Sequence, residues 1–311
     1  MMNPDLLAAA RDHLHNEAIS RQLARQRRLD ELYETLPALR ELDVRIHRTM
    51  LEGLTATLRE DVDPVEAIRA SARANLGAQE ARLALLGKAE IDPASLEPPM
   101  GCALCGDKLY VGSTACRCLI GEVHRRQMQA LGRRLDVERM NFRAFNLNRF
   151  SDAPESGKTT SPRAAMRAVR DSLGEYARGF APGSKNLFIY DDYAKLGKSF
   201  FCACILREVS ERGFWVEYDS AAGLFAALEA EKFDRLREED GDPRRYTRCD
   251  LLVLDDLGTE YVTPFVRAAL YDLINTRLSE RRPMIINSAL SIEGLGGLYG
   301  PQVMNRIKGG F

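Results

Sequence analysis

The chain has no apolar run that approaches the roughly 18–20 residues needed to cross a bilayer. Its first residues, MMNPDLLAAARDHLHNE, lack the basic segment and apolar core of a secretory signal. Its 311 residues contain no internal repeat and no low-complexity tract. These absences argue against membrane-spanning, collagenous and repeat architectures, and we expect a soluble cytoplasmic protein.

Neither sign of charge predominates, because 44 basic side chains stand against 45 acidic ones. The middle of the chain differs, since residues 101–150 carry nine basic and four acidic side chains. This segment also contains Phe142, Phe145 and Phe150, and a basic, aromatic segment suits contact with single-stranded DNA. The alternative is that these rings pin a linker onto a neighbouring core.

The first 90 residues show a helical pattern of apolar side chains. One stripe of apolar residues is expected to be buried: Leu39, Leu42, Ile46, Met50 and Leu54. We predict helices near 4–35, 37–60 and 64–87, with Asp63 as an N-cap. Two readings stay open, a bundle that packs only on itself and a docking surface for a partner protein.

From residue 161 onward the pattern alternates between apolar strands and helices. The predicted strands lie at 186–190, 214–219, 251–256 and 283–287, with 20–40 residues between them. This alternation predicts an α/β fold with a parallel sheet and helices on both faces. Four regions are expected: a helical partner-binding domain (1–90), a zinc-binding module (91–120), a basic helix and linker (121–160) and an α/β domain (161–311).

Four of the seven cysteines crowd into one short segment: Cys102, Cys105, Cys116 and Cys118. Two thiolate pairs ten residues apart can surround Zn²⁺ tetrahedrally, which predicts a structural metal site. His124 is an alternative fourth ligand, and reduced cysteines without metal are the competing interpretation. The other three cysteines are expected in the core: Cys202, Cys204 and Cys249.

A phosphate-binding loop is predicted where strand NLFIY is followed by Gly197, Lys198, Ser199 and an apolar helix. Gly197 lets the backbone approach phosphate, Lys198 reaches the β/γ oxygens of ATP, and Ser199 ligates Mg²⁺. The segment LLVLDD then places Asp255 to hold Mg²⁺ and Asp256 to orient or deprotonate the attacking water.

Two other features bear on nucleotide binding. Gly157-Lys158-Thr159 imitates the same tripeptide, but no strand precedes it, so we interpret it as a loop. The motif also requires glycine at position 192, where this chain has Asp192. That carboxylate repels phosphate, and Lys195 offsets only part of its charge. We therefore expect weak ATP binding and, at most, a weak ATPase.

These residues resemble the DnaC/DnaI-type replicative helicase loaders, AAA+ ATPases of bacteria and their phages, especially the zinc-bearing Gram-positive branch. The resemblance covers roughly residues 96–311. The matching segments are LEPPMGCALCGDKLYVGSTACRCL, NFRAFNLNRFSD, SPRAAMRAV, LGKSFFCACI, CDLLVLDDLGTE and LYGPQVMNRIKGGF.

The resemblance implies a helicase-binding N-terminal domain and a C-terminal AAA+ ATPase that handles single-stranded DNA. Such a protein loads the hexameric replicative helicase during replication initiation or restart and self-associates through its ATPase domain. Arg306 then falls where an arginine finger reaches the nucleotide of a neighbouring subunit. The family pattern is broken at Gln302, a usual arginine position, and at Ala289, where a sensor asparagine is expected two residues after Asn287. The chain also stops at Phe311, before the expected last strand and sensor-2 region.

Two other functions compete with the loader interpretation. The first is a transposition-helper ATPase resembling the IstB group, whose AAA+ core looks much the same but which usually lacks a zinc module. The second is a non-hydrolysing adaptor, in which a degenerate nucleotide pocket only shapes a binding surface for the helicase.

Overall fold

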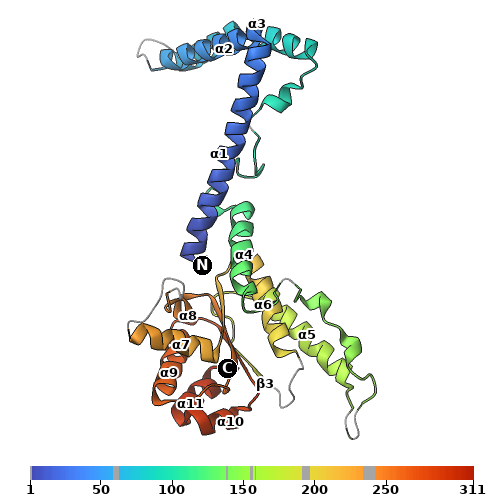
Figure 1. Ribbon diagram of the computed structural model, residues 1–311, viewed down its shortest axis with the longest axis vertical. Coiled ribbons are helices and arrows are strands. Elements are labelled where there is room, and N and C mark those ends of the chain that lie inside the picture. Colours follow the sequence, from blue (N-terminus) through green and yellow to red (C-terminus); the bar gives the residue numbers. More distant parts are fainter. Residues whose placement is uncertain are drawn as a thin grey trace. The chain divides into compact units, whose positions relative to one another are not determined.

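The computed structural model describes residues 2–58, 63–97, 99–137, 139–154, 157, 159–190, 197–233 and 242–311. The chain divides into two compact units. One unit comprises residues 12–111, and the other comprises residues 1–11 together with 112–311. Figure 1 shows the elements of both units.

The helices and strands follow the predicted order. The helices are α1 (Pro4–Thr35), α2 (Pro37–Ala56), α3 (Pro64–Lys88), α4 (Arg117–Gly132), α5 (Pro162–Gly179), α6 (Lys198–Glu211), α7 (Ala221–Lys232), α8 (Arg245–Arg248), α9 (Pro264–Ser279), α10 (Ile292–Tyr299) and α11 (Pro301–Gly310). The strands are β1 (Tyr110–Val111), β2 (Thr114–Ala115), β3 (Leu187–Tyr190), β4 (Val216–Ser220), β5 (Leu251–Leu257) and β6 (Met284–Ser288). Three short 3₁₀ turns add η1 (Pro93–Leu96), η2 (Phe142–Ala144) and η3 (Leu147–Arg149).

A four-stranded parallel sheet forms the centre of the larger unit, with strand order β3-β6-β5-β4. Val253 of β5 lies opposite Tyr218 of β4 and Ile285 of β6. Because partners in a parallel ladder share a face, these three side chains point to one side of the sheet. All four carboxyl ends therefore lie at one edge, where ligands bind in open α/β sheets.

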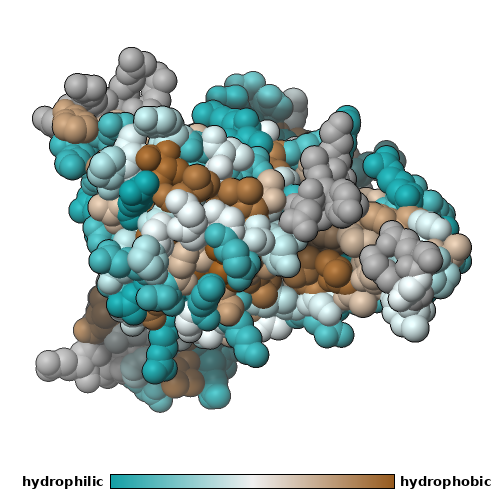
Figure 2. Space-filling view, turned by 90° about the horizontal axis from the view of Figure 1, so that it is seen from below, coloured by the Kyte–Doolittle hydropathy of each residue, from teal (hydrophilic) through white to brown (hydrophobic). Residues whose placement is uncertain are grey.

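Each face of the sheet has its own hydrophobic core. One core joins Val253 and Ile285 to α6, which is itself almost wholly buried. The other core joins Leu252, Leu254 and Ile286 to α7, α9, α10 and α11. Figure 1 shows these helices on the two sides of the sheet, and Figure 2 shows polar residues interspersed with apolar ones on the face of this unit seen from below. The predicted α/β class, a parallel sheet with helices on both faces, is confirmed.

The segment before the sheet is held by aromatic packing. Phe142 is 8% exposed and belongs to the α6-side core, and the ring of Phe145 lies 4.6 Å from that of Phe201, between centroids. These two phenylalanines therefore pin the linker onto α6, which is the alternative to a DNA-stacking role. Phe150 stacks on Phe145 at 5.8 Å and is only partly buried.

A fully buried arginine joins the amino ends of two central strands. Arg277 of α9 is 0% exposed, and its guanidinium donates hydrogen bonds to the backbone carbonyls of Tyr246, Cys249 and Pro283. Cys249 precedes β5 and Pro283 precedes β6. The planar fork of donors in arginine is what allows a single side chain to serve three carbonyls.

The smaller unit is built on the antiparallel pair α2 and α3. Asp43 is 8% exposed and accepts hydrogen bonds from Tyr33 at 2.9 Å and from Arg82 at 2.6 Å. Asp63 caps α3 by accepting a bond from the backbone amide of Val65, as predicted. The three predicted helices of this region are thus confirmed, with α2 ending at Ala56.

The predicted apolar stripe on α2 is buried only at one end. Leu39 is 0% exposed, whereas Met50 and Leu54 are each 50% exposed. The reason is that α3 packs closely along Gly53, where an added Cβ would meet Ser71 at 2.5 Å. Larger side chains beside this close contact are left pointing outward, so the prediction of a buried stripe was wrong for its second half. None of the described helices combines the length and hydropathy that a membrane crossing requires.

Candidate nucleotide-binding site

The start of α6 presents three of the predicted nucleotide-binding residues. Gly197 has a left-handed backbone with φ of 94°, and Lys198 and Ser199 form the first turn. Glycine suits this backbone angle, whereas a Cβ would meet the ring of Phe145 only at ordinary contact distance, 3.5 Å. The first-turn amides of a helix lack intrahelical acceptors and favour an anion.

Strand β5 brings two carboxylates to the carboxyl edge of the sheet. Asp255 is 2% exposed, whereas Asp256 is exposed. Asp256 has φ of 54°, a left-handed conformation that is uncommon outside glycine. Its carbonyl accepts a 2.8 Å hydrogen bond from the Thr259 hydroxyl, which helps to hold the turn. The backbone thus gives the two neighbouring carboxylates different surroundings.

The charges of Lys198 and Asp256 interact across α6 and β5. Partial desolvation raises the pKa of Asp256, the neighbouring Asp255 raises it further, and the Lys198 ammonium lowers it. A carboxylate with a raised pKa is a stronger base and therefore a better proton acceptor. The structure therefore brings together two residues that the sequence placed in separate motifs.

Two partners of Asp255 were missed in the sequence. Tyr218 donates a 2.6 Å hydrogen bond from its hydroxyl to Oδ2, and Asn287 donates from its amide to Oδ1. Asn287 is 0% exposed, whereas Ala289, the position where a sensor asparagine was expected, is exposed. The alternation of side chains along a strand could have revealed these partners. Tyr218 and Asn287 point to the same face of the sheet as Asp255.

Part of the predicted loop lies outside the described residues. This holds for Asp192 and Lys195, so their predicted effects on phosphate binding stay predictions. In the tripeptide Gly157-Lys158-Thr159, Lys158 is likewise outside the described residues. Gly157 lies in a turn and Thr159 in a bend, which agrees with the interpretation of that segment as a loop.

The donor set at the edge of the sheet fits a magnesium ion. Ser199 offers a hydroxyl and Asp255 and Asp256 offer carboxylates, and oxygen donors of this kind are the ligands that Mg²⁺ prefers. Mg²⁺ keeps several waters and is held by one or two carboxylates plus substrate phosphates. This chemistry agrees with the predicted role of these residues beside Lys198.

Arg306 lies on the opposite side of the sheet from α6. It is an exposed residue of α11, and its guanidinium lies 5.8 Å from the ring centroid of Tyr271 on α9. Since α9 packs on the other face of the sheet, Arg306 is separated from Lys198 within one chain. Its predicted role toward a neighbouring subunit therefore stays a prediction.

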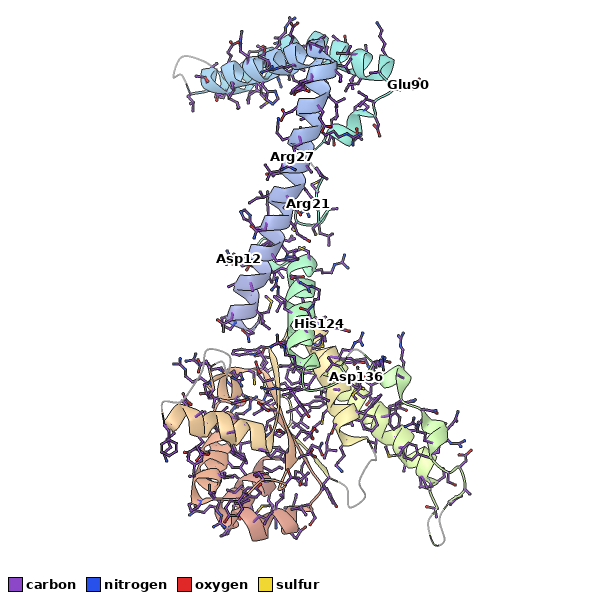
Figure 3. The ribbon with its side chains drawn as sticks, viewed as in Figure 1. Asp12, Arg21, Arg27, Glu90, His124 and Asp136 are labelled. Atoms are coloured by element: carbon purple, nitrogen blue, oxygen red, sulfur yellow. The ribbon has the colours of Figure 1, made fainter. Side chains whose placement is uncertain are left out.

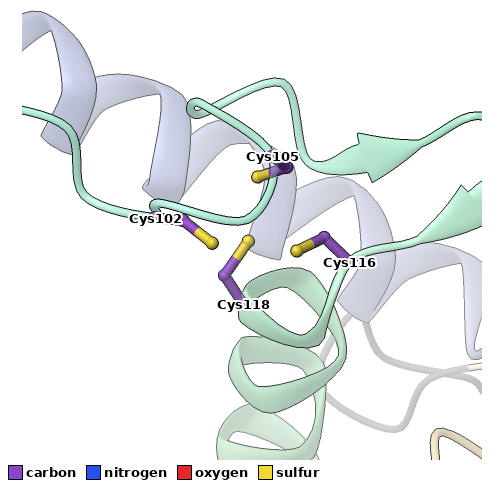
Figure 4. A group of neighbouring side chains, drawn as sticks. All are labelled: Cys102, Cys105, Cys116 and Cys118. Carbon is purple, nitrogen blue, oxygen red and sulfur yellow. The ribbon is translucent and has the colours of Figure 1, made fainter.

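The four predicted zinc ligands form a cluster of sulfurs. The Sγ atoms of the cysteines all lie within 4.8 Å of one another (Figure 4): Cys102, Cys105, Cys116 and Cys118. A tetrahedral zinc with Zn–S bonds of about 2.3 Å holds its sulfurs about 3.8 Å apart. The cluster fits a zinc ion in both ligand type and spacing. The remaining cysteines are 0% exposed, as predicted for core residues: Cys202, Cys204 and Cys249.

The loop that carries the first cysteine pair is braced by a carboxylate. Asp107 accepts hydrogen bonds from the backbone amides of Gly101 at 3.1 Å and Cys102 at 3.0 Å. Arg21 of α1, which is labelled in Figure 3, pairs with the same carboxylate. An added Cβ at Gly101 would lie 2.3 Å from the Arg21 guanidinium, so glycine at this position lets the loop backbone approach the Arg21 side chain.

His124 is not a member of the sulfur cluster. It lies on α4 (Figure 3), and its Nδ1 makes a 2.9 Å hydrogen bond with the Ser210 hydroxyl of α6. The alternative ligand set with His124 was therefore wrong, because the helix turns this ring toward α6. Burial lowers the pKa of His124, and the nearby charge of Glu211 opposes that effect.

Comparison with known proteins supports the nucleotide-binding interpretation. A family model described as IstB-like ATP binding protein matches residues 183–306. The replicative helicase loader DnaC of Escherichia coli strain K12 is 26% identical over 123 residues, which cover 39% of this chain and 49% of that protein. The resemblance to DnaC-type helicase loaders is confirmed. The chain spans about half the length of the curated relatives it matches.

Solved structures of DnaC-type proteins are also similar. A crystal structure of the DnaC helicase loader has a TM-score of 0.45 at 17% identity and covers 56% of this chain and 95% of that chain. A crystal structure of DnaI has a TM-score of 0.42 at 18% identity and covers 49% of this chain and 84% of that chain.

Proposed function

We propose that this protein is an ATP-dependent loader that places a hexameric replicative helicase on single-stranded DNA. The observation that carries the proposal is the meeting of Lys198, Asp255 and Asp256 at one edge of a parallel sheet. This arrangement lies within residues 183–306, which match a model of an ATP-binding family. A protein of this kind acts during replication initiation or restart.

Each residue of the site would have a different role in phosphoryl transfer. The Lys198 ammonium would bind the β/γ-phosphates, and the α6 amides would add further donors. Ser199 and Asp255 would hold Mg²⁺, which neutralises charge that develops on the phosphates. Asp256 would orient the attacking water and accept its proton, a role that its raised pKa favours. We expect slow turnover, because the sequence has the carboxylate of Asp192 where the phosphate-binding motif requires glycine.

The helical region 1–90 would dock on the helicase. Its described part leaves several large apolar side chains of α2 and α3 half or more exposed, among them Leu51 at 61%, Val65 at 56% and Leu76 at 56%. Burying such apolar side chains at an interface with a partner is more favourable than leaving them in water. The ATPase domain would bind single-stranded DNA weakly and with strong salt dependence, and the basic segment 101–150 would share that contact.

The test is co-purification with the replicative helicase, with and without nucleotide. The whole chain should retain the helicase, and a chain lacking residues 1–90 should lose it while keeping its nucleotide affinity. The matched control is Lys198→Ala in the whole chain, which should lose nucleotide and keep the helicase. If the 91–311 fragment retains the helicase as tightly as the whole chain, the docking assignment is wrong.

Two alternatives make different predictions. A non-hydrolysing adaptor would bind the helicase without any turnover of ATP, so a sensitive phosphate-release assay on the helicase complex separates it from a loader. A transposition helper would not retain the helicase. The curated relatives are helicase loaders, and the cysteine cluster also counts against the transposition helper.

A further inference from the structure

The carboxylate of Asp255 accepts hydrogen bonds from side chains of both neighbouring strands. Its Oδ2 accepts the Tyr218 hydroxyl of β4 at 2.6 Å, and its Oδ1 accepts the Asn287 amide of β6. The backbone amide of Asp256 adds a 3.0 Å bond to the same Oδ1. Each oxygen of the carboxylate therefore has a fixed donor that comes from a strand rather than from a loop.

The three side chains share the face of the sheet on which α6 packs. Ser220 is the register partner of Asp255, and Tyr218, two residues earlier, points to the same face. Tyr218 is 8% exposed, Asp255 2% and Asn287 0%. A carboxylate buried this deeply needs hydrogen-bond partners, and it receives two that are neutral.

We propose that Tyr218 and Asn287 are positioning residues that set the orientation of Asp255 toward a magnesium ion. The proposal rests on the proposed nucleotide-binding function. Neither residue touches the reacting atoms. With two donors on Oδ1 and one on Oδ2, the carboxylate is held against rotation about its terminal bond, and Oδ2 keeps a second lone pair for the metal or its water. Outer partners of this kind orient a metal ligand.

The test measures the Mg²⁺ dependence of nucleotide binding by the full chain. A fluorescent ATP analogue is titrated at increasing Mg²⁺, and its binding in excess EDTA is measured separately. For Tyr218→Phe we expect the half-saturating Mg²⁺ concentration to rise about 10- to 100-fold, the range typical of lost outer partners. Binding of the metal-free analogue should stay unchanged, because the phosphate-binding residues are intact.

Tyr246→Phe is the matched control. Its hydroxyl also donates a 2.6 Å bond to a buried carboxylate, that of Asp219, but not to Asp255. Tyr246→Phe should leave the Mg²⁺ midpoint unchanged. Asn287→Ala is the second variant and should shift the midpoint in the same direction as Tyr218→Phe, so the conclusion does not depend on one protein remaining folded.

The failures of the two proposals are distinguishable. If Lys198→Ala abolishes nucleotide binding but Tyr218→Phe and Asn287→Ala keep the wild-type Mg²⁺ midpoint, the positioning role is wrong and the nucleotide site stands. If Tyr246→Phe shifts the midpoint as much as Tyr218→Phe, the effect is a general loss of stability, and the positioning role is again wrong. If the wild-type chain binds no nucleotide at any Mg²⁺ concentration, both proposals are wrong.

Discussion

The guanidinium of Arg21 and the carboxylate of Asp107 form an ion pair, with 3.0 Å between Nη2 and Oδ2. The backbone amide of Gly101 is the main cause that lowers the pKa of Asp107, and Arg21 and the Cys102 amide lower it further. One carboxylate thus joins α1 to the loop that carries the first cysteine pair. Partners that fix a ligand-bearing loop contribute to metal affinity.

Replacing Asp107 should weaken zinc binding without removing a ligand. For Asp107→Ala we expect the apparent zinc affinity to fall about tenfold or more, because the Cys102 amide loses its acceptor and the loop is no longer ordered for the metal. Competition with a chromophoric chelator measures the change. Asp92→Ala, which removes the cap of η1, serves as the control and should leave the affinity near that of the wild type.

Removing a sulfur should have a larger and more local effect. We expect one zinc per wild-type chain, and Cys102→Ser should lose most of it because folding and metal binding are coupled in small modules. Limited proteolysis should then cut within residues 96–120 while the α/β domain stays intact. Elemental analysis checks the zinc content, with Cys204→Ala as a variant that should keep it. Well under half an equivalent of zinc in fresh wild-type protein would contradict the assignment.

Asp192→Gly should tighten nucleotide binding. A like charge beside the phosphates costs about 1–4 kcal/mol, depending on the local dielectric. That range corresponds to roughly five-fold to several-hundred-fold in affinity. Titration of a fluorescent ATP analogue measures the effect, and Lys198→Ala should abolish binding in the same assay. Equal affinities for wild type and both variants would show that the nucleotide is not held by this loop.

Arg306→Ala should separate binding from turnover. Because Arg306 lies on α11 beside Tyr271 and not on the α6 side of the sheet, we expect the monomer to bind nucleotide with wild-type affinity. Turnover in the helicase-bound assembly should fall, since an arginine supplied by a neighbour stabilises transition-state charge. Phosphate release, measured in both states, checks this. An equal loss in the isolated monomer would place Arg306 in its own chain's site.

The stability of the larger unit should depend on pH through His124. Burial lowers its pKa below the ordinary value of 6.5, so the unfolded chain binds the proton more readily. The contribution of His124 to the free energy of unfolding is therefore complete above about pH 6.5, and it declines as the pH falls below that value. The free energy of unfolding should therefore decrease less for His124→Gln than for wild type between pH 7.5 and 5.5. Chemical denaturation at a series of pH values checks this.

The sequence predicted the sheet well because its central strands, β5 and β6, are buried on both faces. Apolar runs such as LLVLDD have few alternatives to a central parallel strand, and β5 begins at the predicted residue. The stripe on α2 was harder to predict. Hydropathy places Met50 and Leu54 on the same face as Leu39, but the contact of Gly53 with Ser71 decides how close α3 comes. Sequence periodicity carries no information about that distance.

The candidate site shows the same limit. Its charged residues lie in short motifs, so Lys198 and Asp255 were predicted. Tyr218 and Asn287 were missed as partners of Asp255 because their roles depend on strand register between segments about 30 residues apart or more. His124 was wrongly offered as a metal ligand because closeness in sequence to Cys118 does not fix the direction of a helical side chain. In each case the missing information was a pairing in space.

The buried Arg277 makes the two ends of the sheet different in character. Its partners are backbone carbonyls, which do not titrate, and its side chain is fully buried, so salt screens the contact between the amino ends of β5 and β6 only weakly. The opposite edge of the sheet carries carboxylates, an ammonium and a strained backbone turn. One end of the sheet is therefore tied by a buried contact, and the charged side chains of the candidate site lie at the other end.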